Sequence, residues 1–250
     1  MSVLIQLDAP MMSFGHVAVD AARDTLPFPT LSMMTGLIGN ALGYDHREAH
    51  KLSALQGRMH MAARIAAKRP GRSRIEDFHT ADLGQDFMRY ENVAWTTAGR
   101  IEERKGGAAK HGTHIRVRRY VTGGSPSGRD HHIDGRVPPI VVALSLSEGD
   151  GPTEAEVAHA LDFPERPLFI GRKCCLPSCR LFLETVDATP AQAAADLPHR
   201  ELPTLWIDWS DAIPSGWSPT SQTLLLRDRR DWTNQIHVGS RTVIECKKDA

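Results

Sequence analysis

Basic side chains gather in one part of an otherwise neutral chain. The 250 residues include 30 Lys and Arg and 30 Asp and Glu, so the formal net charge is zero. Between residues 100 and 119 the cations are opposed only by Glu102 and Glu103. A local run of cations in a neutral protein is typical of a surface that meets phosphates at one place. The cations of this run are Arg100, Arg104, Lys105, Lys110, Arg116, Arg118 and Arg119, with His111 and His114 among them.

Known catalytic and metal-binding patterns do not account for the other polar residues. The sequence has no Gly-x-Ser-x-Gly elbow, no Walker loop and no His-Glu-x-x-His helix. Cys174, Cys175 and Cys179 crowd into one segment, whereas a zinc site presents two separated pairs of ligands. The neighbours His131 and His132 lie in a glycine-rich stretch with no third ligand in view. We therefore expect no catalytic residue, no metal and no cofactor, and we expect reduced structural thiols.

A glycine-marked helix is expected over residues 30–43. Apolar residues recur there at the i, i+3, i+4, i+7, i+8 spacing of a core-facing helix. Thr30 or Ser32 can cap the first turn, and Gly43 can end the helix. Gly36 and Gly39 each cost roughly 0.5–1 kcal/mol relative to alanine inside a helix, which is tolerated where a neighbour comes close. Packing of the helix on a sheet is the favoured explanation, and approach of a ligand is the alternative.

Hydrophobic periodicity indicates an α+β fold. We expect strands at residues 3–7, 59–66, 140–146 and 167–171, with helices at 30–43, 45–57 and 153–161. This order matches the ferredoxin-like, RRM-like βαββαβ arrangement with one added helix. Residues 77–119 have few apolar positions and no clean period, which favours an extended β-hairpin or binding loop.

Short strands at residues 179–186, 202–208, 222–226 and 242–246 are expected further along the chain. We therefore expect a ferredoxin-like domain over residues 1–171, which includes the excursion at about 77–119, and a small β-rich domain over residues 172–250.

The hydropathy pattern argues against a membrane location. No run approaches the ~20 apolar residues that a spanning helix needs, and the first residues lack the basic start and apolar block of a signal peptide. We expect a cytoplasmic globular protein.

Several short motifs follow one another along the chain. They are Leu-Asp-Ala-Pro-Met-Met-Ser-Phe-Gly at 7–15, Pro-Thr-x-Ser at 29–32 running into Gly-Leu-Ile-Gly-x-Ala-Leu-Gly at 36–43, Asp-Phe-His-Thr at 77–80, Arg-Tyr at 119–120, and Arg-Pro-Leu-Phe-Ile-Gly-Arg-Lys at 166–173 with Cys175. In this order they resemble the CasD family of the RAMP superfamily, and the resemblance covers roughly residues 4–178. In type I-E CRISPR systems this family is the subunit of the effector Cascade that holds the 5′ handle of the guide RNA.

The resemblance implies a non-catalytic, RNA-binding subunit of a ribonucleoprotein complex in antiviral defence. It places a long β-hairpin thumb at about residues 79–116, where it would clasp the repeat-derived handle. The implied partners are the guide RNA, the Cascade backbone subunit and the Cascade large subunit, with target DNA met only through the complex.

The residues themselves suggest three places for phosphate contacts. One is the basic run at the thumb and its base. Another is the start of the helix at residue 30, where free backbone N–H groups suit an anion. The third is the cation pair beside Gly171. The expected RNA-binding residues are Ser32, Thr35, Arg100, Arg104, Lys105, Lys110, His111, Arg116, Arg118, Arg119, Arg172 and Lys173.

Two other functions stay open at this point. Relatives from type I-C systems resemble metal-independent endoribonucleases that process precursor guide RNA, and Lys110, His111 and either Tyr44 or Tyr120 could take such roles. A ferredoxin-like interaction module unrelated to nucleic acid is the other alternative. Cleavage of a repeat RNA would support the endoribonuclease, and stable binding without cleavage would support the RNA-capping function. Absence of both would support the interaction module.

Overall fold

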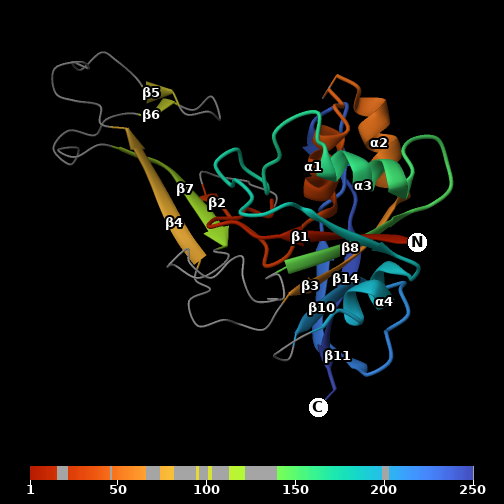
Figure 1. Cartoon of the computed structure of the whole chain (residues 1–250). Coiled ribbons are helices and arrows are strands. Elements are labelled where there is room, and N and C mark those ends of the chain that lie inside the picture. Colours follow the sequence, from red (N-terminus) through yellow and green to blue (C-terminus); the bar gives the residue numbers. More distant parts are fainter. Residues whose placement is uncertain are drawn as a thin grey trace.

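A seven-stranded antiparallel sheet forms the centre of the molecule (Figure 1). The computed structural model describes residues 1–15, 22–45, 47–65, 74–81, 94–95, 101–102, 113–121, 140–198 and 203–249. The strand order is β11-β14-β10-β3-β8-β1-β9, and each neighbouring pair is antiparallel. These strands are β1 (Ser2–Leu7), β3 (Met59–Ile65), β8 (Ile140–Leu146), β9 (Phe182–Val186), β10 (Thr204–Asp208), β11 (Trp217–Leu226) and β14 (Arg241–Lys248).

Four helices cover the two faces of this sheet. In Figure 1, α1 (Leu31–Ala41), α2 (Ala49–Arg58) and α3 (Glu154–Asp162) lie on one side, and α4 (Pro190–Ala195) lies on the other. Successive side chains of β3 point to opposite faces of the sheet, so Met61 belongs to the core under α1 and Ala62 belongs to the core under α4. Phe28 stacks on Trp206 in the larger core, with ring centroids 4.7 Å apart.

Most of the expected elements are confirmed close to their expected bounds. β1, β3, β8 and the helices α1, α2 and α3 occur where the periodicity places them, and Thr153 caps α3 in a capping box with Glu156. The four expected C-terminal strands correspond to β9, β10, β11 and β14. Helix α4, with Thr189 as N-cap and a proline in its first turn, was not expected.

The strand expected at residues 167–171 is wrong. The segment is irregular, and Gly171 turns the chain with φ of 95°. Ile170 is fully buried, but its N–H donates to the carbonyl of Cys175 and its carbonyl accepts from Ser13 N, so its backbone bonds close a turn. The apolar run therefore anchors a loop, and β9 takes the place beside β1.

Residues 172–250 add four strands to the same sheet. β9 extends it beside β1, while β10, β14 and β11 extend it beyond β3. The division of the chain at residue 171 stays a prediction. The described residues include no helix that is long and apolar enough to cross a membrane.

Gly39 of α1 serves packing, but against α2 and not against the sheet as favoured, while Gly36 lies opposite Trp232. A Cβ at Gly39 would lie 2.5 Å from Leu52 Cδ2 of α2, so the two helices touch at this point. A Cβ at Gly36 would lie 3.6 Å from Trp232 Cη2, an ordinary contact distance. The helix is capped by Thr30 and ends before Gly43, which has φ of 76°.

A second sheet projects from the central one on the side of α1 (Figure 1). Its order is β2-β7-β4, with β4 (Arg74–Ala81) antiparallel and β2 (Ala22–Arg23) parallel to β7 (Thr113–Val121). The short pair β5 (Ala94–Trp95) and β6 (Ile101–Glu102) belongs to the chain between β4 and β7. The antiparallel pairing of β4 with β7 is what the base of a long hairpin requires.

Candidate nucleic-acid interface

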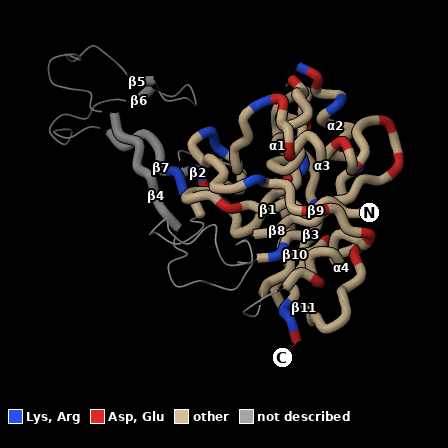
Figure 2. The backbone as a smooth tube through the Cα atoms, viewed as in Figure 1, with Lys and Arg blue, Asp and Glu red and all other residues tan. Residues whose placement is uncertain are grey.

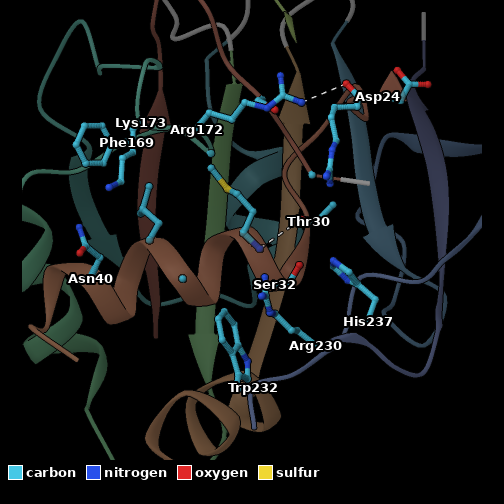
Figure 3. A pocket seen from close by; sticks show the side chains of 17 residues that line it. Asp24, Thr30, Ser32, Asn40, Phe169, Arg172, Lys173, Arg230, Trp232 and His237 are labelled. Carbon is cyan, nitrogen blue, oxygen red and sulfur yellow. Dashed lines mark hydrogen bonds between the residues drawn. The ribbon is translucent and has the colours of Figure 1, made fainter. Parts of the chain in front are cut away.

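A cleft of about 520 Å³ lies between α1, the loop after residue 168 and a C-terminal hairpin (Figure 3). The hairpin consists of β12 (Arg230–Asp231) and β13 (Ile236–His237). The cleft lining contains four cationic side chains, Arg23, Arg172, Lys173 and Arg230, and one carboxylate, Asp24. An excess of positive charge in a concave site favours an anionic ligand.

One stripe of α1 forms the floor of the cleft. Its lining residues Ser32, Met33, Gly36, Leu37 and Asn40 follow the spacing of one helix face. Met33 and Leu37 make the middle of this floor apolar, and Gly36 contributes no side chain. Hydroxyl and amide groups stand at the two ends of the stripe. An apolar floor between polar ends suits a ligand with a flat apolar part and polar edges.

The first turn of α1 is not available to an anion, so that expectation is wrong. The N–H of Leu31 donates to the Asp228 carboxylate at 2.9 Å, and the N–H of Ser32 donates to the Asp228 carbonyl at 3.0 Å. The N–H of Met33 donates to the hydroxyl oxygen of the capping residue Thr30. A buried side chain of this chain therefore occupies the position that a phosphate would take at a helix N-terminus.

The loop of residues 169–173 forms one wall. A Cβ at Gly171 would lie 1.8 Å from the Ser13 carbonyl oxygen, so the loop approaches residue 13 as closely as only glycine permits. The Arg172 guanidinium donates to the carbonyls of Arg119 and Arg23 and lies 4.7 Å from the Tyr120 ring centroid. Arg172 therefore ties β7 and β2 to the loop, and the exposed Lys173 is the second cation of the loop at the cleft.

The β12–β13 hairpin forms the opposite wall, and the sequence did not single it out. Gln56 of α2 holds it by donating to the Arg230 carbonyl and accepting from the Arg230 N–H. The Asp231 carboxylate accepts from the N–H groups of Thr233 and Asn234, which shapes the turn. The Asp-Trp-Thr-Asn order is a local signal for such a turn, but only the tertiary contact with α2 brings the hairpin to α1.

The structure brings some of the expected RNA-binding residues to this cleft and leaves others away from it. Ser32, Arg172 and Lys173 line it. Thr35 does not, because it is fully buried and its hydroxyl donates to the Leu31 carbonyl inside the helix. A hydroxyl in that position cannot meet a strand at the surface.

The basic run lies at the base of the projecting sheet or outside the described residues. Arg118 and Arg119 are half-buried at the end of β7, and Arg119 faces Asp24 with a nitrogen to oxygen distance of 3.7 Å. Arg116 lies in β7 opposite His79. The remaining members, Arg100, Arg104, Lys105, Lys110 and His111, lie outside the described residues, as do His131 and His132.

Charge is unevenly distributed over the described backbone. Figure 2 shows Lys and Arg around β2 and the adjoining end of β7, while Asp and Glu predominate at the opposite edge of the view, around α3 and α4. The neutral total in the sequence therefore conceals a basic side, formed by β2, the adjoining end of β7 and the cleft. Attraction of a polyanion is then local and sensitive to salt.

The cysteines and the tyrosines named above have structural surroundings. All four cysteines are free, and burial raises the pKa of Cys175 and of Cys179 to about 11. Burial also raises the pKa of Tyr120, whose hydroxyl lies 3.6 Å from Cys174 Sγ. No cluster of three or more His, Cys, Asp or Glu with the spacing of a metal site occurs among the described residues.

Comparison with known proteins identifies the family. The model of the family described as CRISPR-associated protein (Cas_Cas5) matches residues 2–244, which is nearly the whole chain. The chain belongs to this Cas_Cas5 family. It is also 25% identical, over 197 residues, to the CRISPR system Cascade subunit CasD of Escherichia coli (strain K12), a match that covers 77% of this chain and 74% of that protein.

Two solved structures share the fold. One is a chain of a CRISPR RNA-guided surveillance complex, with a TM-score of 0.66, 24% identity, and coverage of 100% of this chain and 91% of that chain. The other is described as a Cas protein, with a TM-score of 0.57, 21% identity, and coverage of 100% of this chain and 95% of that chain. The α+β architecture with a large antiparallel sheet is therefore common to all three.

Proposed function

We propose that this chain is the subunit of a type I-E Cascade that binds the 5′ handle of the guide RNA. The observation that carries the proposal is the position of the cationic cleft. Segments from distant parts of the sequence build it, and two of its cations adjoin the base of the projecting sheet, because Arg23 pairs with Arg118 and Arg172 donates to the Arg119 carbonyl. A single strand that passes from this base into the cleft would have its phosphates neutralised at short intervals. Family membership and the similarity to CasD support the same function.

The fold supports an RRM-like core for this function. The four strands β3-β8-β1-β9, with α1 and α2 between β1 and β3 and α3 between β8 and β9, have the order of a ferredoxin-like sheet. In this interpretation β4 and β7 are the base of the thumb. Because helices cover both faces of the sheet, RNA contacts would come from loops and the thumb and not from the sheet face.

We propose that the subunit is not catalytic. A tyrosine acts as a base only as tyrosinate, and burial raises the pKa of Tyr120, which keeps its proton in place. The Lys51 ammonium lies 5.2 Å from the Tyr44 ring centroid, and the backbone carbonyl of Tyr44 accepts a hydrogen bond from Arg166. The proposed partners are the guide RNA, the backbone subunit and the large subunit in the cytoplasm, and the surfaces for the two proteins stay predictions.

The direct test mixes the purified chain with a repeat-derived RNA over a series of salt concentrations. We expect binding whose affinity falls steeply with salt, and no shortening of the RNA with or without magnesium or a chelator. Specific cutting in chelator that His111→Ala abolishes in a folded protein would assign the processing activity instead. Absence of both binding and cutting would favour an interaction module without nucleic acid.

A further inference from the structure

The β12–β13 hairpin carries two buried N–H donors that have no acceptor. They are Trp232 Nε1 and Arg230 Nε, and neither has a hydrogen-bond partner among the described residues. Trp232 is 8% exposed, and Arg230 is half-buried. Buried polar groups are nearly always paired, so two such donors two residues apart need an explanation.

Both donors belong to the wall of the cleft. Arg230, Trp232 and Ser32 all line it, and Figure 3 shows them together at one end of α1, while Phe169, Lys173 and Asn40 stand at the other end. A structural role explains the tryptophan ring, because it covers Gly36. It does not explain the indole N–H, because a phenylalanine ring could cover Gly36 without burying an unpaired donor.

The arrangement of the two side chains is that of a closed site. The Arg230 guanidinium lies over the indole with its carbon 5.2 Å from the ring centroid, and its Nη2 donates to the Gln235 side chain at 2.6 Å. Burial lowers the pKa of Arg230, so water solvates its charge poorly here. Because both donors are buried, a ligand in the cleft would meet them only after rotation of the Arg230 side chain away from Gln235. An anionic ligand makes that rotation favourable because it replaces the lost solvation.

We propose that the β12–β13 hairpin makes the cleft a subsite for one splayed-out nucleotide, with Trp232 and Arg230 donating to acceptor atoms of that nucleotide. The inference rests on the proposed function and adds to it the ligand unit and two contact residues. The acceptors are phosphate oxygens or the O6 and N7 atoms of guanine, since both present a close pair of acceptors to an arginine. The cleft volume suits one nucleotide, and the apolar floor of Met33 and Leu37 suits the face of a base.

The test observes the Trp232 indole directly in the folded protein. In the full chain labelled with ¹⁵N-tryptophan, the five indole signals are recorded, and Trp232→Phe assigns the signal of interest. The probes are repeat-derived RNA, each of the four nucleoside 5′-monophosphates, and inorganic phosphate. We expect the Trp232 signal to shift with RNA and with nucleotide. A shift with guanosine monophosphate alone assigns the base edge, and a shift with all nucleotides and with phosphate assigns the phosphate.

Affinity for the RNA provides the second readout. Trp232→Phe removes the N–H and keeps a ring against Gly36, and we expect it to weaken RNA binding roughly three- to tenfold, the loss of one hydrogen bond. Trp209→Phe is the matched control, because Trp209 is 67% exposed and does not line the cleft. An unmoved Trp232 signal in a stable RNA complex, or equal RNA affinity for the two variants, overturns this inference and leaves the proposed function standing. Failure of the unaltered chain to bind the RNA overturns both.

Discussion

Among the described glycines, Gly171 has the closest neighbour to an added Cβ. Its φ of 95° disfavours any side chain, and the Ser13 carbonyl occupies the space of a Cβ at 1.8 Å. Gly171→Ala should therefore destabilise the fold by more than the roughly 1–2 kcal/mol of a left-handed backbone alone. Urea unfolding of the variant measures the change.

Gly216→Ala is the control for the backbone contribution. Gly216 has φ of 75°, but no heavy atom lies within 4 Å of a Cβ built there. The difference between the two variants isolates the contact with Ser13. Equal destabilisation would mean that the loop moves away from residue 13 at no cost, and the close approach would then have no structural role.

Gly39 tests the packing of α1 on α2. We expect Gly39→Leu to destabilise the protein by about 1–3 kcal/mol through overpacking against Leu52, with no RNA present. Gly36→Ala is the control, because its Cβ makes an ordinary contact with Trp232 and helix propensity favours alanine by roughly 0.5–1 kcal/mol. If Gly39→Leu kept the free energy of unfolding but lost guide RNA, the glycine would serve a ligand.

At the scale of elements, one ion pair joins the start of α1 to the end of the sheet. Asp228 is 2% exposed, accepts from the Leu31 N–H and pairs with Arg241 of β14 at 2.9 Å. Asp228→Asn keeps an acceptor for the helix but leaves the Arg241 charge without its main partner, so we expect a loss of about 3 kcal/mol in unfolding experiments.

The exposed pair of Asp162 with Arg180 provides the comparison. The Arg180 side chain is 57% exposed, so Asp162→Asn should cost less than about 1 kcal/mol. A similar, small effect of both substitutions would show that solvent reaches Asp228, and the helix start would then again be a candidate anion site.

The projecting sheet should be separable from the core. Among the residues of this sheet whose burial the structure describes, those in the hydrophobic core lie at the end of β7. Tyr120 is buried there, and Val121 is partly buried against the core. Replacement of residues 82–109 by a short glycine linker should therefore leave cooperative unfolding intact, since surface loops are shortened at little cost. We expect the shortened chain to lose assembly into the effector complex, measured by co-purification of the other subunits. Loss of cooperative unfolding would place the segment in the core.

At the scale of the whole molecule, the sequence predicts regular elements better than the contacts between them. The periodicity of β8 and the capping box of α3 are local and place both elements correctly. The run at residues 167–171 has the composition of a strand, but a turn bonded to Ser13 and Cys175 overrides it. The bond to Ser13 joins residues far apart in the chain, so no local pattern contains it.

The residues of the cleft could also be predicted only where a local pattern marks them. Ser32, Arg172 and Lys173 were expected because they stand beside a helix start or a glycine. The hairpin wall was missed because Gln56 positions it from 174 residues away. The helix start was misjudged for the same reason, since its acceptor, Asp228, comes from the other end of the sequence.

The basic side of the neutral molecule leads to the last prediction. Replacing Arg116, Arg118 and Arg119 by alanine should weaken guide binding and lower the slope of log affinity against log salt by about one phosphate contact for each arginine engaged. Arg47, Lys51 and Lys247 provide a control with the same change of net charge, because they are exposed and do not line the cleft. If net charge alone attracted the RNA, both triple variants would lower the slope equally. A reduction confined to the first triple would assign the phosphate contacts to the base of the projecting sheet, and an unchanged slope in both would show these arginines to be a solvated face.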